Sequence, residues 1–460
     1  MTRRSWRIDV ATADIGPFWL FEAGSSVIRM RTATVDEVEQ YLLSELPPVA
    51  RNAMTAGTGR LRAARLLARL GNPQDTLRVV HIAGTAGKGS VAAFVSAILH
   101  AHGFRVGTFL SPHVHSVLER FQLDGRPADA AAVTPAVRAV REYERDVSGE
   151  PTGQVTMFEA ATAVAFQLFR QQNVDYAVVE TGIGGLHDAT NTVTRRDKLA
   201  VLTAVGLDHT AVLGETVPEI AAQKAGIMAQ GGMAVAVRGA AADAVFAGEA
   251  ARRRCSLNLV SEQDALAELP AGVVPGLGGP HQRVNAGLAV RAVQHLARRD
   301  GWALDPGHVA DGLRRVRLPG RFERRCWSGR PVVLDGAHNP VKLAALVAAL
   351  RSEWPGRKPV WVLTAKPDKD IAEALRVIAP CASAVVATQF DTVGVNSARG
   401  PVVTASEIAA AARQCGIESV HVKPRMRAAV RCAVGLSAPD TPVVVTGSFF
   451  AVADAGELMS

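Results

Sequence analysis

The sequence has few cysteines, and none of them is arranged to build a disulfide framework or a zinc cluster. Its 460 residues include five cysteines, an odd number, and no two of them form a C-x-x-C pair. Disulfide-rich and zinc-ribbon folds depend on paired cysteines, so both classes are excluded. Unpaired cysteines are typical of a protein in a reducing compartment, and we expect a cytoplasmic protein.

Long hydrophobic runs are also missing. No stretch approaches the ~20 uninterrupted apolar residues that a membrane-spanning helix needs. The first residues, 1–7, are basic, but Asp9, Asp14 and Glu22 interrupt the region where the apolar core of a secretory signal would stand. We therefore expect neither an integral membrane protein nor a secreted one.

Aromatic residues and lysines are scarce. Aromatics make up 5% of the chain, which is too few for a platform on which nucleic-acid bases stack. The formal charge of +8 comes almost entirely from arginine, because the chain has only eight lysines. A preference for arginine over lysine explains this charge, and acidic substrates such as nucleotides or carboxylates also suit it. We expect no nucleic-acid partner, and a lysine inside a motif becomes informative.

Short apolar segments alternate with helical patterns along most of the chain. This alternation predicts a doubly wound α/β fold. A break rich in Pro and Gly near 318–331 divides the chain, and a new strand–helix series starts after it. We predict an N-terminal extension at 1–30, a P-loop ATPase domain at 31–318, and a smaller Rossmann-like α/β domain at 328–460. Predicted strands are 79–83, 105–109, 176–180, 200–204, 233–237, 332–335, 360–364, 384–387 and 443–446. Predicted helices are 89–102, 158–171, 217–227, 283–298, 340–351, 369–378, 405–414 and 447–456.

A glycine-rich loop follows the first of these strands. Glycines let the backbone N–H groups wrap a phosphate, and the start of the next helix adds a positive dipole end. Lys88 would supply a point charge, and the Ser90 hydroxyl is a possible Mg²⁺ ligand. The spacing differs from the usual G-x-x-x-x-G-K-[ST], so a glycine-rich turn without a ligand is the alternative. The predicted ATP-binding residues of this loop are Gly84, Thr85, Gly87, Lys88, Gly89 and Ser90.

Together with later motifs in the same order, this loop resembles the folylpolyglutamate synthase/dihydrofolate synthase family of the Mur ligase superfamily. The resemblance extends from about residue 35 to 455. The further motifs are Ser111-Pro112-His113 with Glu119-Arg120, Phe158-Glu159, Glu180-Thr181-Gly182-Ile183-Gly184-Gly185 with Asp188-Ala189-Thr190-Asn191, Leu207-Asp208-His209-Thr210, Lys224-Ala225-Gly226-Ile227, His281-Gln282 with Asn285-Ala286, Pro319-Gly320-Arg321, Asp335-Gly336-Ala337-His338-Asn339-Pro340 and Thr446-Gly447-Ser448.

The resemblance implies two Mg²⁺ sites. Ser90, Glu180 and His209 would hold one ion on the ATP phosphates. Lys224, carbamylated by CO₂, would bind the second. From the residues alone, Glu180 ends an apolar strand, where ligands of open α/β sheets gather, and a carboxylate there suits Mg²⁺. A buried structural role for His209 and a surface position for Lys224 are the alternatives.

Other residues match ATP and substrate contacts of the family. Asn285, Arg321 and Asp335 would contact ATP, and His338 would lie near the γ-phosphate and the acyl phosphate. An ion pair at the hinge is the alternative for Arg321, and a helix N-cap is the alternative for Asp335. Thr156, Met157 and Phe158 match the stretch that borders the pterin, although Phe158 fits an ordinary core position equally well.

The chain departs from the family pattern in three places. Ala86 replaces the usual Asn of the phosphate loop, and Leu118 replaces an Asn before Glu-Arg. Leu186-His187 replaces the usual Arg-Leu. The last two departures lie near the expected folate side, so they concern the acceptor substrate more than the ATP chemistry.

The predicted activity is ATP-dependent ligation of L-glutamate to a folate or dihydropteroate carboxylate through an acyl phosphate. Lys88, Lys224 and His338 are the predicted catalytic residues, Mg²⁺ is the expected cofactor, and a monomer is expected. One alternative is a Mur-type ligase acting on a peptidoglycan precursor. Such enzymes usually carry a nucleotide-sugar domain before the ATP loop, and only about 80 residues precede Gly84. A catalytically altered nucleotide-binding paralogue is another alternative, and a nucleic-acid-binding ATPase is a distant one.

Overall fold

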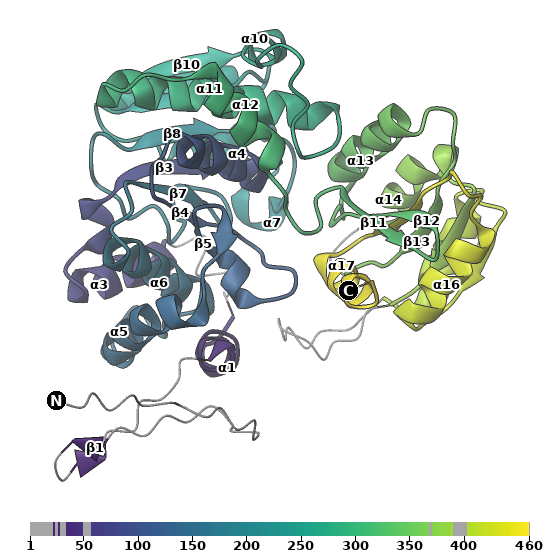
Figure 1. Cartoon of the computed structure of the whole chain (residues 1–460), viewed down its shortest axis with the longest axis horizontal. Coiled ribbons are helices and arrows are strands. Elements are labelled where there is room, and N and C mark those ends of the chain that lie inside the picture. The colour runs from purple at the N-terminus through teal and green to yellow at the C-terminus, as the bar shows by residue number, and fades with distance from the viewer. Residues whose placement is uncertain are drawn as a thin grey trace, which may run out of the picture.

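A computed structural model of the chain shows two lobes, each built around a mostly parallel sheet (Figure 1). The structure describes residues 22–23, 26–27, 34–48, 57–367, 370–389 and 403–459. Of the predicted N-terminal extension, only the two-residue strands β1 (Glu22–Ala23) and β2 (Ser26–Val27), which pair antiparallel, are among them.

The first lobe is organised by an eight-stranded sheet of order β10-β9-β8-β3-β7-β4-β5-β6. Its strands from β10 to β4 are parallel, and β5 and β6 add an antiparallel edge. The central strands are apolar and buried on both faces, as parallel strands covered by helices must be. The strands are β3 (Arg78–Ala83), β4 (Val106–Phe109), β5 (Phe121–Leu123), β6 (Arg126–Pro127), β7 (Tyr176–Glu180), β8 (Leu199–Leu202), β9 (Met233–Val237) and β10 (Ser256–Val260).

Helices cover both faces of this sheet. Alternate residues of one strand belong to different cores: Val79 packs with the α3, α5 and α6 side, and Val80 packs with the α4, α11 and α12 side. The helical segments are α1 (Val35–Glu39), the π-helical η1 (Gln40–Glu45), α3 (Thr58–Arg69), η2 (Pro73–Thr76), α4 (Lys88–Ala101), η3 (Val117–Arg120), α5 (Ala130–Ser148), α6 (Met157–Gln171), α7 (Thr210–Leu213), α8 (Val217–Ala225), α9 (Asp243–Arg253), α10 (Glu262–Ala267), α11 (Pro280–Asp300) and α12 (Pro306–Arg315).

The second lobe contains a six-stranded sheet of order β11-β12-β16-β13-β14-β15. Only the β11–β12 pair is antiparallel. One face packs against α13, α14 and α15, and the other packs against α16 and α17. The segments are β11 (Glu323–Trp327), β12 (Arg330–Leu334), α13 (Pro340–Glu353), β13 (Val360–Leu363), α14 (Ile371–Ile378), η4 (Ala379–Cys381), β14 (Ala384–Ala387), α15 (Ala405–Gln414), β15 (Val420–Val422), α16 (Met426–Leu436), β16 (Val443–Thr446) and α17 (Phe449–Glu457).

The predicted fold class is confirmed: two α/β units follow one another, and the first carries the glycine-rich loop after β3. The stretch predicted as a break, 318–331, contains β11, which pairs with β12 and so belongs to the second sheet. The exact domain boundaries stay a prediction. Within the described residues, no helix has the length and apolar character needed to cross a membrane.

A buried ion pair ties α3 to the start of α6. Arg62 donates from Nε to Glu159 Oε2 at 2.8 Å and from Nη2 to Oε1 at 2.7 Å, and both side chains are about 95% buried. Arg62 Nη1 also donates to the carbonyl of Thr152, and Glu159 accepts from the backbone N–H of Thr156. The pair therefore fixes the segment that leads into Met157.

We expect Glu159→Ala to lower the free energy of unfolding by about 3 kcal/mol, because it leaves the Arg62 guanidinium buried without a counter-charge. Urea unfolding of the whole protein, monitored by circular dichroism, measures this loss. The control is Glu150→Ala, which removes the partner of Arg65 in a more exposed pair and should cost less than about 1 kcal/mol. Equal losses for the two variants would contradict the assigned role of the buried pair.

Candidate active site

A cavity of about 970 Å³ lies between the two lobes and is lined by both. The first lobe contributes the glycine-rich loop and the carboxyl ends of neighbouring strands. The second lobe contributes the segment after β12 and the first turns of α13 and α17. Each residue that the sequence singled out for catalysis, ATP, metal or pterin lines this cavity. They are Gly84, Thr85, Gly87, Lys88, Gly89, Ser90, Thr156, Met157, Phe158, Glu180, His209, Lys224, Asn285, Arg321, Asp335 and His338.

Two glycines of the loop are required because neighbouring atoms lie too close for a side chain. Gly87 has φ +86°, and a Cβ atom there would lie 2.6 Å from Asn285 Oδ1. A Cβ atom at Gly84 would overlap the Thr203 hydroxyl. Only glycine fits either position, and the tight loop brings Asn285 of α11 against the site.

The loop holds its shape although Ala86 replaces the usual Asn. Thr203 donates from its hydroxyl to the carbonyl of Ala86 at 2.7 Å, and the N–H groups of Thr85 and Ala86 donate to the carbonyl of Ala204. Since α4 begins at Lys88, the N–H groups of its first turn point out of the helix start. That arrangement, with its dipole, suits an anion.

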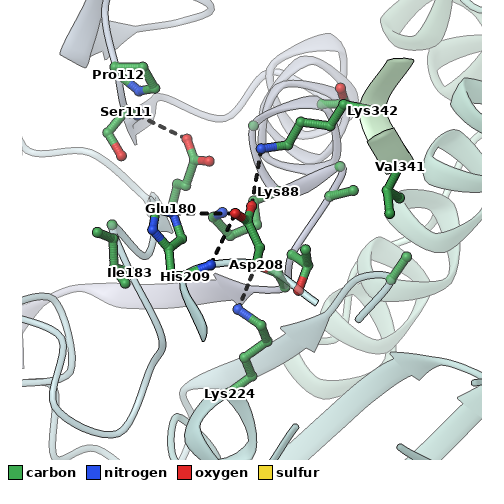
Figure 2. Close-up of a pocket in the computed structure, with 18 of the residues that line it drawn as sticks. Lys88, Ser111, Pro112, Glu180, Ile183, Asp208, His209, Lys224, Val341 and Lys342 are labelled. Carbon is green, nitrogen blue, oxygen red and sulfur yellow. Dashed lines mark hydrogen bonds and ion pairs between the residues drawn. The ribbon is translucent and has the colours of Figure 1, made fainter. Parts of the chain in front are cut away.

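Glu180 ends β7 beside the start of α4. A Cβ atom at Gly89 would lie 3.3 Å from Glu180 Oε2, which also accepts from the backbone N–H of Ser111 at 2.9 Å (Figure 2). Burial raises the pKa of this carboxyl, while the nearby charge of Lys88 and the Ser111 hydrogen bond act in the opposite direction. A positive ion at the loop would further favour the ionised form.

His209 lies on the turn that precedes α7. Its backbone is left-handed, with φ +51°, and its side chain is 41% exposed, so the alternative of a buried structural histidine is wrong. The adjacent Asp208 carboxylate is almost buried and accepts from the backbone N–H of His209 at 3.1 Å. His209 thus presents its ring to the cavity rim.

Lys224 is buried on α8, so its alternative assignment as a surface lysine is also wrong. Its Nζ donates to the carbonyl of Gly84 at 2.9 Å. Burial, followed by the positive charge of Lys88, lowers its pKa to about 7. A large fraction of this amine is therefore neutral near physiological pH, which is the state that reacts with CO₂.

In the second lobe, Arg321 and Asp335 flank the cavity. The Arg321 guanidinium lies 4.7 Å from the centre of the Phe449 ring. Asp335 is buried and accepts from the backbone N–H groups of Phe322 and Ala337. Burial raises its pKa, and the charge of Arg321 opposes that shift. Asp335 is not a helix N-cap, because Asn339 caps α13.

The segment predicted to border the pterin begins α6. Phe158 packs 5.8 Å from Phe109, ring centre to ring centre, and its ring lies so close to Gly182 that no side chain would fit there. Phe158 contacts the core and also lines the cavity, so a core position and a position beside the pterin are compatible. Among the departures, Leu118 is buried in the core, and His187 lines the cavity.

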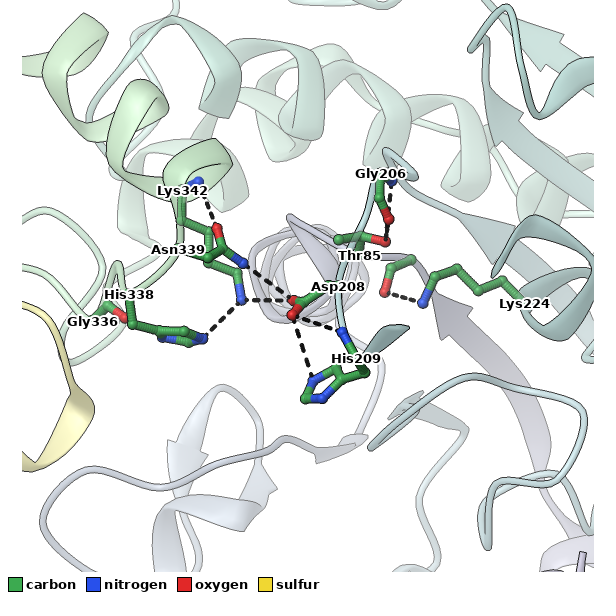
Figure 3. Close-up of polar contacts among 10 residues, drawn as sticks. Thr85, Gly206, Asp208, His209, Lys224, Gly336, His338, Asn339 and Lys342 are labelled. Carbon is green, nitrogen blue, oxygen red and sulfur yellow. Dashed lines mark hydrogen bonds and ion pairs between the residues drawn. The ribbon is translucent and has the colours of Figure 1, made fainter. Parts of the chain in front are cut away.

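Lys342 and Asp208 are polar residues of the site that received no role from the sequence. Lys342, on α13, reaches Asp208 of the first lobe, with Nζ 3.2 Å from Oδ2, and it also lies 3.2 Å from His338 Nε2 (Figure 3). The sequence held one signal for Lys342: it follows His338 by four residues, one helical turn, in a chain with few lysines.

Known protein families and individual proteins are similar to this chain in sequence. The sequence profile of the Mur ligase middle domain matches residues 82–270, and that of the Mur ligase glutamate ligase domain matches residues 320–449. The dihydrofolate synthase/folylpolyglutamate synthase of Bacillus subtilis is 33% identical over 354 residues, which cover 73% of this chain and 81% of that protein. The folylpolyglutamate synthase of Lacticaseibacillus casei is 32% identical over 415 residues, which cover 85% of this chain and 91% of that protein.

Solved structures show the same similarity. Mycobacterium tuberculosis folylpolyglutamate synthase complexed with ADP superposes with a TM-score of 0.80 at 30% identity, covering 93% of this chain and 98% of that one. A folylpolyglutamate synthase complex with AMPPCP and folate superposes with a TM-score of 0.74 at 29% identity, covering 93% of this chain and all of that one.

Proposed function

The chain belongs to the folylpolyglutamate synthase/dihydrofolate synthase family of the Mur ligase superfamily, and from that premise we propose that it joins the amine of L-glutamate to a folate or dihydropteroate carboxylate with ATP as co-substrate. The observation that carries the proposal is the shared cavity: an anion-binding loop and buried Lys224 on one lobe face Arg321 and His338 on the other.

The reaction proceeds in two steps. The folate carboxylate attacks the γ-phosphorus of ATP, ADP leaves, and an acyl phosphate forms. The amine of glutamate then attacks the acyl carbon and phosphate leaves. Phosphoryl transfer depends on positioning and charge neutralisation, which the α4 start, Lys88 and Arg321 supply. Enclosure between the lobes excludes water, which would otherwise hydrolyse the acyl phosphate.

The residues present fit Mg²⁺. Ser90 and Glu180 are oxygen donors at the loop, and His209 stands at the cavity rim; a carbamate on Lys224 would add two oxygens for a second ion. Within the described residues, no group of three or more His, Cys, Asp or Glu side chains is arranged to hold a metal. That suits Mg²⁺, which is usually held by one or two carboxylates, water and substrate phosphates. When bound, Mg²⁺ neutralises charge on the phosphate oxygens.

Each residue predicted to bind ATP, metal or pterin lines one cavity of a single chain, which is compatible with a monomer as the catalytic unit. The five cysteines are all free thiols in the structure, which supports a reducing compartment such as the cytoplasm as the place of reaction.

The proposed function is tested by ADP release from the purified protein with ATP, L-glutamate and a panel of acceptors: dihydropteroate, tetrahydrofolate and its glutamates, and peptidoglycan nucleotides. Release that requires both glutamate and a pterin acceptor supports it, and the preferred acceptor separates the dihydrofolate synthase from the folylpolyglutamate synthase activity. Release only with a peptidoglycan nucleotide would identify a Mur-type ligase. Nucleotide binding without any release would identify a catalytically altered paralogue.

Glu180→Gln and His209→Ala are each expected to lower the rate of ADP release at least about a hundredfold and to raise the Mg²⁺ concentration needed for half-maximal rate, because each removes a ligand of the first ion. A Mg²⁺ titration of the initial rate measures both. His100→Ala, which alters an exposed histidine at the far end of α4, is the control and should behave as wild type. A variant that keeps both its rate and its Mg²⁺ requirement would exclude that residue as a ligand.

A further inference from the structure

Lys342 is a cationic side chain of the second lobe that extends into the cavity, where the glycine-rich loop of the first lobe also lies. It lies in the first turn of α13, where its backbone N–H donates to the capping side chain of Asn339 at 2.9 Å. Its side chain is only 19% exposed and lines the cavity between the lobes. Helix capping fixes its backbone, and the contacts of Nζ with Asp208 and His338 hold the side chain in the cavity.

The Lys342 ammonium is held by one group from each lobe. Asp208 Oδ2 of the first lobe and His338 Nε2 of the second each lie 3.2 Å from Nζ (Figure 3). An ammonium has three N–H donors, so these two contacts leave one N–H for a further acceptor. In Figure 2 the Lys342 amine points into the cavity on the side where Lys88 lies.

His338 must accept from Lys342 rather than donate to it. Its Nδ1 lies 2.8 Å from the carbonyl of Gly336, which can only accept, so Nδ1 carries the proton. Nε2 then has a lone pair, and the ammonium of Lys342 donates to it. His338 and Lys342 therefore form one unit whose polar ends meet at the same point of the cavity.

Positive charges converge around that point. Burial contributes most to the lowered pKa of Lys342, and the charges of Lys88 and Arg321 lower it further, whereas Asp208 acts in the opposite direction. Lys342 and Lys88 act in the same way on Lys224. Cations packed this closely repel one another, and an anion placed among them removes the repulsion.

We propose that Lys342 binds the terminal phosphoryl group of ATP from the side opposite the glycine-rich loop. The loop and the start of α4 approach the phosphates from the first lobe, while Lys342 approaches from the second, beside His338. The group that it reaches is the one transferred to the carboxylate, and the contact forms only when the lobes are closed. This inference rests on the proposed function, because it assumes that ATP occupies the cavity.

A purely structural role is the opposing explanation. On that account, Lys342 joins the lobes through its ion pair with Asp208 and never contacts a phosphate. Its removal would then change the affinity for ADP and for a triphosphate equally, or not at all. A phosphoryl contact instead weakens only the ligand that carries the terminal group.

The test is calorimetric titration of ADP and of AMPPCP into wild type, Lys342→Met and the control Lys358→Met, with Mg²⁺ present. Methionine keeps the unbranched stem and removes the charge. Lys358 is an exposed lysine of the same lobe outside the cavity, so its variant loses the same charge elsewhere. We expect Lys342→Met to weaken AMPPCP binding about tenfold or more, the loss of a charge-assisted hydrogen bond, and ADP binding less than about twofold. Lys358→Met should match wild type.

Retained ADP binding also reports that the variant is folded. Parallel losses for ADP and AMPPCP, or unchanged AMPPCP affinity, would overturn the assignment of Lys342 while leaving the proposed function intact. Failure of the wild-type protein to bind either nucleotide would overturn the proposed function itself, and this inference with it.

Discussion

Lys88→Ala is expected to lower the rate of ADP release at least about a thousandfold without unfolding the protein, because it removes the one lysine that the glycine-rich loop places at the phosphates. The side chain of Lys88 lines the cavity, and its charge reaches Glu180, Lys224 and Lys342. Its main-chain position as the first residue of α4 tolerates alanine, so the loop geometry is kept.

Initial rates with saturating folate acceptor and glutamate measure this effect, and thermal unfolding checks the fold. Lys358→Ala serves as the matched control, since it removes a lysine from an exposed position. Turnover of Lys88→Ala within tenfold of the wild-type rate would refute the phosphate-loop assignment. The expected loss is large because the charge acts on the group being transferred, where no other loop residue carries a positive side chain.

The local motifs of the site were predictable because each depends on a short stretch of chain. Gly84 is required because Thr203 lies too close for a side chain, and Gly87 because Asn285 lies close and its φ is positive. In the sequence both requirements are visible as glycine. Glu180 is visible as a carboxylate at the end of an apolar run, and that run is β7. Strand ends in a parallel sheet meet at one edge, so separate motifs converge.

The contacts between lobes were not predictable from pattern alone. Asp208 and Lys342 are 134 residues apart and meet only because the second lobe docks over the first. In the sequence, Asp208 is an acidic residue before a histidine, and Lys342 is a lysine in a helical pattern. Neither pattern indicates which distant residue the side chain contacts. Likewise, the helix N-cap alternative for Asp335 was excluded only by the structure, in which Asn339 caps α13.

Missed elements have a similar explanation. β11 has the sequence Glu-Arg-Arg-Cys-Trp and lies at the edge of its sheet with three exposed residues, so it lacks the apolar run that marked the central strands. Helix α5 contains Pro135, a residue that normally ends a helical pattern, inside the helix and beyond the first residues whose N–H groups lack an intrahelical acceptor.

Lys224→Ala is expected to be nearly inactive, with a loss of at least about a thousandfold, and to be partly rescued by short carboxylates such as acetate or propionate. The reason is the charge that the site needs. An unmodified ammonium repels the nearby charge of Lys88 and cannot ligate a metal ion, whereas a carbamate changes the sign and offers two oxygens to a hard cation. The carbamate nitrogen keeps one N–H, so the hydrogen bond to Gly84 survives the modification.

The pH dependence follows from the lowered pKa of Lys224. Carbamate formation consumes the neutral amine; with a pKa of about 7, that form becomes abundant as pH rises through neutrality, whereas an ordinary lysine would be less than about 0.1% neutral there. Activity at fixed CO₂ should therefore rise between about pH 6 and pH 8, and added bicarbonate should raise it most in the lower half of that range.

Lys224→Arg separates this mechanism from a simple phosphate contact. Arginine keeps the positive charge and can donate to Gly84, but it does not form the carbamate, so the variant should be as inactive as Lys224→Ala. Short carboxylates should not rescue it, because the larger side chain fills the space that they would occupy. If Lys224 acted as a cation on ATP, arginine would retain much of the activity and acetate would have no effect on the alanine variant. Activity of Lys224→Arg within tenfold of wild type would therefore exclude the carbamate, whatever the pH profile of the wild-type enzyme.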